Sequence, residues 1–157
     1  MDIIILSGIP GSGKTTWRQR HYPTVSGKVS VVSANAYFER DGEFRFNPAL
    51  LDEAHGSCFR QYLRILASGQ DGICIVDNTN TTAWEISPYV LAASAFGKHK
   101  VRVVTFMCEN YGEAKDCARR NIHGAPMGVV LAQHSKLIER VLPPWWQHEI
   151  HSVSFAI

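Results

Sequence analysis

The chain has 157 residues, and 45% of them are hydrophobic, which suits a single compact domain with a complete core. Its 16 lysines and arginines against 14 aspartates and glutamates give a net charge of +2, which argues against a long non-specific footprint on DNA. We therefore expect one domain over residues 1–157, with any basic patch confined to a small surface.

Cysteine spacing and hydropathy argue against zinc-binding, thiol redox, secreted and membrane proteins. Cys58, Cys74, Cys108 and Cys117 form no CxxC pair, so zinc binding and thiol redox chemistry are not indicated and buried thiols are expected. The first apolar run, 3–6, follows no cationic segment and is too short for a signal peptide, and no stretch approaches transmembrane length. We expect a cytoplasmic protein without membrane contact, acting in the host cytoplasm if it is viral.

Apolar, β-branched runs alternate with helix-length segments along the chain. The predicted strands are 3–6, 29–32, 73–76 and 101–106, with a last edge strand over 152–157. The predicted helices are 14–21, 48–68, 82–96, 111–121 and 128–141. This order predicts an α/β fold: a doubly wound, mostly parallel sheet flanked by helices, with a ligand crevice at the carboxyl ends of the strands.

The segment between the first strand and the first helix, Gly8-Ile9-Pro10-Gly11-Ser12-Gly13-Lys14-Thr15, matches the phosphate-binding pattern G-x-x-x-x-G-K-[ST]. In such a loop the backbone N–H groups surround phosphate, the lysine meets the β- and γ-oxygens, and the threonine hydroxyl holds Mg²⁺. We predict ATP and Mg²⁺ as cofactors. The expected nucleotide-binding residues are Gly8, Pro10, Gly11, Ser12, Gly13, Lys14, Thr15 and Thr16.

A P-loop alone does not separate kinases from switches and motors. The chain has no NKxD guanine-reading segment, which argues against a GTPase, and it is short for a motor ATPase. A small kinase is the interpretation that remains.

A second cluster of polar residues follows the third predicted strand. Asp77 ends that strand and is expected to support Mg²⁺ together with Thr15. Asn78 and Asn80 add polar groups beside it, and we predict that they contact the substrate.

An arginine pair marks a predicted lid over about 111–127. Arg119 and Arg120 come shortly before a Gly-x-Pro break, and arginines on a mobile lid can stabilise charge on the transferring phosphoryl group. Of the two, Arg120 is the better candidate for catalysis. His123 is explained equally well as a substrate contact or as a structural histidine.

The loop after the second strand is dense in aromatic and charged residues. Tyr37 and Phe38 could stack on a base while Arg45 meets a phosphate. The alternative is a loop pinned by Phe44 and Phe46 in a small satellite core, and the sequence does not decide between the two.

Together these segments resemble the polynucleotide kinase family of P-loop phosphotransferases. The likeness rests on the P-loop and on 33–38, 76–80 and 119–126, and it spans roughly residues 3–140. The compact chain also resembles the bacteriophage 5-hydroxymethyluridine DNA kinases. The resemblance implies ATP-dependent transfer of the γ-phosphate to a nucleic-acid hydroxyl, either a 5′-hydroxyl or a hydroxymethyl group on a modified base. DNA is expected in preference to RNA, and the protein is expected to be a monomer or a weak dimer.

The resemblance also implies an aspartate after the second strand that accepts the hydroxyl proton, and here that position is Asn35. An amide is no base near neutral pH, and losing a general base commonly costs ~10²–10⁴ in rate. Phosphoryl transfer tolerates this loss because its transition state is loose, so we expect reduced activity. Three explanations are open: a deliberate change from Asp to Asn that traps a complex, which we favour, a natural member with another base, or a binding protein that lost the chemistry.

Two other functional classes remain in view. One is a small-molecule kinase acting on a nucleoside or a metabolite. The other is a non-catalytic module that binds nucleic acid in an ATP-dependent way.

Overall fold

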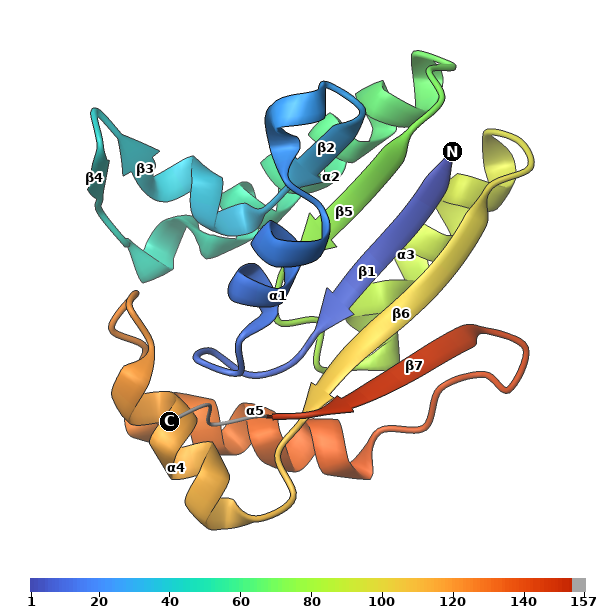
Figure 1. The fold of residues 1–157 in the computed structure, drawn as a ribbon. Helices are drawn as coiled ribbons and strands as arrows, with labels where there is room; N and C mark the ends of the chain where they lie inside the picture. The colour runs from blue at the N-terminus through green and yellow to red at the C-terminus, as the bar shows by residue number, and fades with distance from the viewer. Residues whose placement is uncertain (154–157) are drawn as a thin grey trace.

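The computed structural model describes residues 1–153 and is built around a five-stranded sheet in the order β2-β5-β1-β6-β7 (Figure 1). Neighbouring strands in this sheet are all parallel. The strands are β1 (Asp2–Ser7), β2 (Val29–Val32), β5 (Ile73–Asp77), β6 (Lys100–Met107) and β7 (Gln147–Ser152). The predicted doubly wound α/β fold is confirmed, with the strand that leads into the P-loop at the centre of the sheet.

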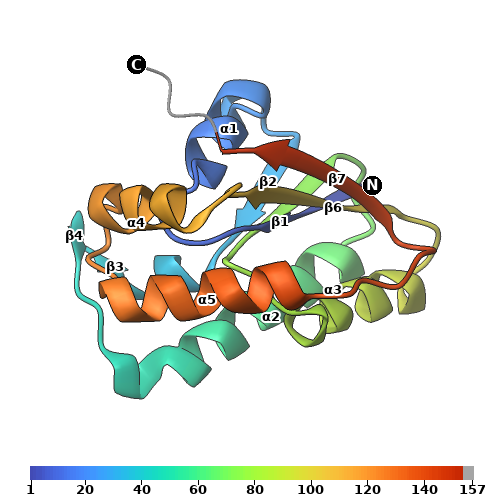
Figure 2. The same ribbon diagram turned by 90° about the horizontal axis from the view of Figure 1, so that it is seen from below.

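Helices connect the strands close to where the sequence predicts them. They are α1 (Lys14–His21), α2 (Leu51–Ala67), α3 (Ala83–Ala95), α4 (Tyr111–Arg120) and α5 (Met127–Glu139), with short 3₁₀ segments η1 (Thr24–Ser26) and η3 (Pro48–Leu50). Side chains fix two of the starts: Thr82 and Glu85 form a reciprocal capping box at α3, and Asn110 accepts a hydrogen bond from the Glu113 N–H at α4. Figure 2 shows α1 on one side of the sheet, with α2, α3 and α5 on the other.

The loop after β2 contains structure that the sequence analysis missed. A 3₁₀ segment, η2 (Ala34–Phe38), leads into a small hairpin of β3 (Glu39–Arg40) and β4 (Glu43–Phe44). Its turn, Asp41-Gly42, has positive φ at both residues, 54° and 78°, which is the geometry that Asp-Gly favours in two-residue hairpins. Two-residue strands are too short to show an alternating apolar pattern, so the Asp-Gly turn is the sequence feature that could have indicated this hairpin.

The last strand is displaced from its prediction. We expected 152–157, whereas β7 runs over Gln147–Ser152 beside β6, and the rest of the predicted strand beyond residue 153 lies outside the described residues. The reason is that an edge strand with one neighbour need not be apolar. Its sequence, QHEIHS, carries no hydrophobic run.

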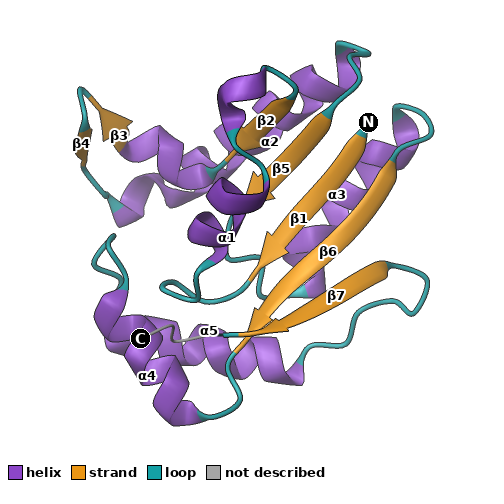
Figure 3. Ribbon diagram, in the orientation of Figure 1, coloured by secondary structure: helices purple, strands orange, loops and turns teal. Residues whose placement is uncertain are grey.

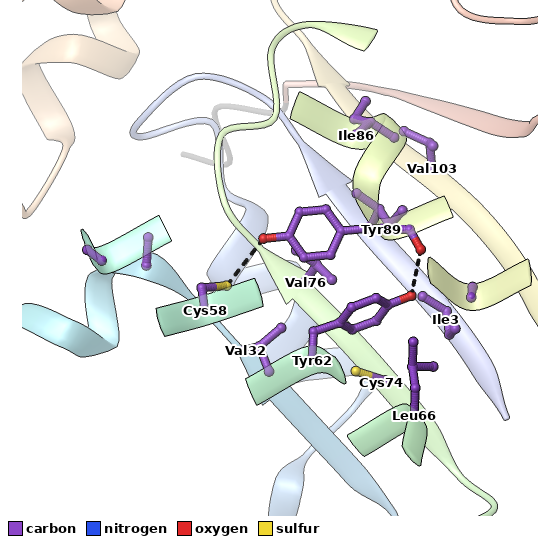
Figure 4. Close-up of a cluster of buried hydrophobic side chains, with 14 of the residues drawn as sticks. Ile3, Val32, Cys58, Tyr62, Leu66, Cys74, Val76, Ile86, Tyr89 and Val103 are labelled. Carbon is purple, nitrogen blue, oxygen red and sulfur yellow. Dashed lines mark hydrogen bonds between the residues drawn. The ribbon is translucent and has the colours of Figure 1, made fainter. Parts of the chain in front are cut away.

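The core lies on both faces of the sheet because successive residues of β1 point to opposite sides. Ile3 and Ile5 pack in one buried cluster, and Ile4 and Leu6 in the other. In the first cluster the Tyr62 hydroxyl of α2 donates to the Tyr89 carbonyl oxygen of α3 at 2.9 Å, tying the two helices together (Figure 4). The side chains of the four cysteines are buried free thiols, as predicted.

No helix within residues 1–153 is both long and apolar enough to cross a membrane.

Candidate active site

Strands β1, β5 and β2 lie side by side and end at one edge of the sheet (Figure 3), and three of the predicted site positions lie at these ends. The P-loop follows β1, Asp77 closes β5 and Asn35 lies just beyond β2. Because the order of these strands is β2-β5-β1, the three positions follow one another along the carboxyl edge. With neighbouring strands ~4.8 Å apart, β2 lies about 10 Å from β1, within reach of a triphosphate that extends from the P-loop.

The P-loop has the backbone that its glycines permit. Gly11 and Gly13 adopt positive φ values of 77° and 92°, and a Cβ at Gly11 would collide with the carbonyl oxygen of Cys117 in α4. The N-cap of α1 is Gly13, which has no side chain to cap the helix. The first N–H groups of α1 are thus available to an anion, as nucleotide binding requires.

Lys14 is a buried cation that donates hydrogen bonds to neutral oxygen atoms. Its side chain is only 8% exposed, and Nζ donates to the Gly8 and Ile9 carbonyls at 2.8 and 2.9 Å. Burial lowers the pKa of Lys14 from 10.5 to about 8, an effect that the charge of Asp77 partly opposes. A phosphate group would supply the negative charge that this position lacks.

Asp77 lies directly against the start of α1. Its Oδ2 accepts from the Thr15 hydroxyl at 3.1 Å and from Arg18 Nε at 3.0 Å. Thr15 and Asp77 offer hard oxygen donors side by side, which suits Mg²⁺ when phosphate oxygens complete the coordination. Arg18 was not predicted, although its place one helical turn after Thr15 could have indicated it.

The other P-loop residues surround this centre. Ser12 is buried, Pro10 is partly buried, and Thr16 is exposed at the third position of α1.

The two lid arginines point in different directions. Arg120 Nε donates to the carbonyl oxygen of Gly11 in the P-loop at 2.5 Å. Arg119 is 64% exposed and pairs with Asp116 on its own helix at 2.8 Å. The structure therefore brings Arg120 to the phosphate-binding loop and leaves Arg119 on the outer face of α4.

Asn78 and Asn80 are engaged within the protein. Asn78 is 7% exposed, and its Oδ1 accepts from the Ala34 N–H at 2.8 Å. Asn80 is 3% exposed, and its amide donates to the Leu6 carbonyl at 2.8 Å. We therefore assign them a structural role, holding the ends of β1, β2 and β5 together, in place of the substrate contact expected from the sequence.

The position of Asn35 follows from these contacts. Its own N–H donates to Ser33 Oγ at 3.2 Å, and the preceding residue, Ala34, is the one held by Asn78. Asn35 is partly buried and follows β2, the strand that neighbours β5 and its terminal Asp77.

Of the six residues predicted to contact the substrate, Phe38 is a third, after Asn78 and Asn80, that lies inside the protein. Phe38 is 4% exposed and belongs to the core, so it is unsuited to stacking on a base. Tyr37 is partly buried, and a hydrogen bond with Glu53 is the main cause of its raised pKa.

The remaining two lie on the surface beside the hairpin. Arg45 is 76% exposed and makes two hydrogen bonds to Glu43 Oε2, at 2.6 and 3.0 Å. His123, in the loop between α4 and α5, packs on Phe44 with ring centroids 4.3 Å apart. The lid and the hairpin therefore touch through this pair.

Arg140, at the end of α5, is a residue that the sequence analysis missed. Its guanidinium donates to Ser7 Oγ at 2.6 Å, to the Asn80 carbonyl at 3.0 Å and to Thr105 Oγ1 at 2.8 Å. Burial lowers the pKa of Arg140 to about 10. Its partners are distant in sequence, so no local pattern could have indicated that it joins the carboxyl ends of the central strands.

Comparison with known families places the chain in one of them. A family model described as an AAA domain matches residues 3–144, which include the P-loop, Asp77 and the lid. The chain belongs to this AAA domain family. Human NEDD4-binding protein 2 is 33% identical to the domain over 124 residues, which are 78% of this chain. The chain spans only 7% of the length of that relative.

Solved structures with the same fold include kinases. A gluconokinase from Sinorhizobium meliloti aligns over 99% of this chain and 84% of its own, with a TM-score of 0.59 and 11% identity. A sugar kinase from a Janibacter species aligns over 98% of this chain and 86% of its own, with a TM-score of 0.59 and 14% identity. At such identities the likeness concerns the fold, which is that of P-loop kinases.

Proposed function

We propose that this domain is a cytoplasmic ATP-dependent kinase that transfers the γ-phosphate to a hydroxyl of a nucleic acid, with DNA preferred to RNA. The observation that carries the proposal is the row of Lys14, Asp77 and Asn35 along the ends of β1, β5 and β2. This row sets a phosphate-binding group, a magnesium-supporting carboxylate and the position of the proton acceptor side by side, as in the polynucleotide kinases that the sequence resembles.

The donor half of the reaction would be held by the P-loop. Lys14 would leave its carbonyl partners, Gly8 and Ile9, and bind β- and γ-oxygens, which restores a counter-charge to a buried ammonium. Thr15 and Asp77 would hold Mg²⁺, which neutralises phosphate charge when bound. Arg18, hydrogen-bonded to Asp77, would fix the orientation of that carboxylate.

The lid would act when the phosphoryl group moves. Arg120 already reaches the P-loop through the Gly11 carbonyl, so a small shift of its guanidinium would place it on the transferring group. Arg119, paired with Asp116 on the outer face, would not take part.

Asn35 would meet the acceptor hydroxyl. Its amide can accept a hydrogen bond from that hydroxyl and orient it, but it cannot take the proton. The proton would pass to solvent or to the phosphoryl group late in the transfer, which makes the reaction slow.

A second candidate is a kinase for a small molecule, which the sugar kinases among the proteins of the same fold support. The two candidates share the donor half of the site and differ only in the acceptor.

Radiolabelled transfer from [γ-³²P]ATP to a panel of acceptors tests the proposal. The panel contains single-stranded DNA and RNA with 5′-hydroxyls, duplex DNA with a hydroxymethylated base, free nucleosides and gluconate, each with the present protein and with Asn35→Asp. Label on an oligonucleotide is the expected result. Label only on a nucleoside or on gluconate would favour the second candidate. ATP binding without label on any acceptor, even with Asn35→Asp, would indicate a binding module.

A further inference from the structure

Three aromatic rings join the hairpin to the lid, and we call this group the aromatic bridge: Phe44, Phe46 and His123. Phe44 lies 4.3 Å from His123 between ring centroids, and the Phe44 and Phe46 rings are nearly parallel, at 8°, with centroids 6.4 Å apart. The hairpin and the lid loop lie next to each other on one side of the molecule in both ribbon views (Figures 1 and 2).

The aromatic bridge packs on the core through Phe38 and is partly exposed to solvent at Phe46. The buried ring of Phe38 meets Phe46 edge-on at 5.1 Å and Phe44 at 6.1 Å, so both rings rest on the core. Phe46 nevertheless remains 50% exposed. A ring held in place yet half exposed can accept another ring on its free face without losing much conformational freedom.

Charge around the bridge does not favour a polyanion. Residues 39–45 contain three acidic and two basic side chains, and one of the basic ones, Arg45, is already paired with Glu43. A surface of this kind cannot gather several phosphates, since that requires an excess of lysine and arginine. Recognition at the bridge must therefore come mainly from stacking.

We propose that the aromatic bridge is the recognition site for a single unpaired base of the acceptor, which stacks on the exposed ring of Phe46 while His123 holds the lid against the neighbouring Phe44. The inference rests on the proposed function and names what the acceptor must offer: a flat heteroaromatic ring next to the reacting hydroxyl, with few phosphate contacts. A base within a duplex would have to leave its stack to bind.

The same geometry couples the acceptor to the donor. His123 lies three residues after Arg120, which contacts the P-loop. A base that holds His123 against the hairpin therefore also stabilises the lid segment that carries Arg120. Acceptor binding and ATP binding should then reinforce each other, by the same factor in each direction.

The test compares Phe46→Ala and His123→Ala with wild type, using oligonucleotides that carry either a normal or an abasic 5′ nucleotide. Affinity is measured by fluorescence anisotropy with a non-hydrolysable ATP analogue present, and the KM for the acceptor is measured by transfer. Ile122→Ala, in the same loop and 88% exposed, and Trp145→Ala, 80% exposed just before β7 at the opposite end of the sheet, are the matched controls.

We expect Phe46→Ala to weaken binding of the normal acceptor about tenfold, since base stacking on an aromatic ring contributes ~1–3 kcal/mol. His123→Ala should weaken it less, Phe46→Trp should restore it, and the two controls should leave it unchanged. The abasic acceptor should bind equally to wild type and Phe46→Ala. Raising the salt from 50 to 200 mM should weaken binding by no more than the loss of about one phosphate contact.

Equal losses for normal and abasic acceptors would overturn the proposal, because Phe46 would then serve only the packing of the hairpin. Failure of the proposed function has a different signature. If a nucleoside is phosphorylated, no oligonucleotide is, and Phe46→Ala raises the KM for the nucleoside, the bridge stands while the nucleic-acid acceptor is wrong. Transfer to gluconate that is insensitive to Phe46→Ala would overturn both.

Discussion

The two halves of the site are built in different ways. The half around the P-loop, which would hold the phosphate donor under the proposed function and is called the donor half, has a buried, hydrogen-bonded centre: Lys14 is held by backbone carbonyls, and Thr15 and Arg18 meet on Asp77. The acceptor half, around the hairpin, is exposed, aromatic and of mixed charge, and its main contact with the donor half is one pair of rings, Phe44 and His123.

This difference explains why the fold indicates nucleotide binding but not the identity of the acceptor. The fold, with the P-loop after its central strand, is shared with kinases at 11–14% identity. The hairpin depends on a few exposed side chains that can change without disturbing the core. Substitutions in the hairpin should therefore change which acceptor is chosen without changing which group the P-loop binds.

The largest expected effect lies in the donor half. Lys14→Ala should lower transfer to every acceptor by at least about 10³, because a charge at the phosphates is lost. The melting temperature of the ligand-free protein should not fall, since the wild-type ammonium is desolvated there. Calorimetry and transfer assays check this, with the exposed Lys136→Ala as control. Unchanged turnover would refute the kinase assignment.

The next effect lies where the two halves meet. Asn35→Asp should raise transfer by ~10²–10⁴, the contribution of a general base, with little change in ATP affinity. The gain should disappear at low pH as the new carboxylate is protonated. Rates measured across pH for both proteins check this, and equal rates at every pH would mean that position 35 is not the base.

The two lid arginines should differ in their effect on catalysis. Arg120→Ala should lower kcat by ~10²–10³ and change the KM for ATP much less, because its guanidinium counts mainly in the transition state. Arg119→Ala, on the same helix, should change kcat by less than about threefold. Steady-state kinetics with ATP varied check both. A larger loss for Arg119→Ala would show that the outer face of α4 turns inward on closure.

The smallest effect is a pH dependence confined to the donor half. Below pH 8 Lys14 is charged and ready for phosphate, whereas above its lowered pKa of about 8 ATP must bind together with a proton. ATP affinity should therefore fall about tenfold between pH 7 and pH 9. The buried charge also costs stability below pH 8, and this cost should fade as the pH rises toward 10.5.

Calorimetric titration of ATP and thermal melts across this pH range check the linkage. In Lys14→Met, which keeps the aliphatic chain, both dependences should be lost. If they persist in Lys14→Met, another group is responsible.

The sequence predicted what is local and periodic. Helix α1 and strand β2 have the predicted bounds, because glycines and apolar runs mark them directly, and the P-loop is one contiguous pattern. Asp77 was predicted as the polar end of an apolar strand, and the structure sets it beside Thr15.

The sequence could not show the contacts between residues that lie far apart in the chain. Arg140 reaches Ser7 across 133 residues, and Asn78 holds Ala34 across 44. The roles of these side chains follow from partners that no local pattern relates. The aromatic bridge is another such case, because the same aromatic-rich segment is compatible with a small satellite core and with an acceptor site.

The most direct test of the account is a crystal structure of the protein with Asn35 in place, together with a non-hydrolysable ATP analogue and a short 5′-hydroxyl oligonucleotide. The account predicts γ-phosphate on Lys14, the acceptor hydroxyl ~2.6–3.2 Å from the Asn35 amide, and the terminal base on Phe46. An oligonucleotide bound away from Asn35, with the nucleotide correctly on the P-loop, would contradict it.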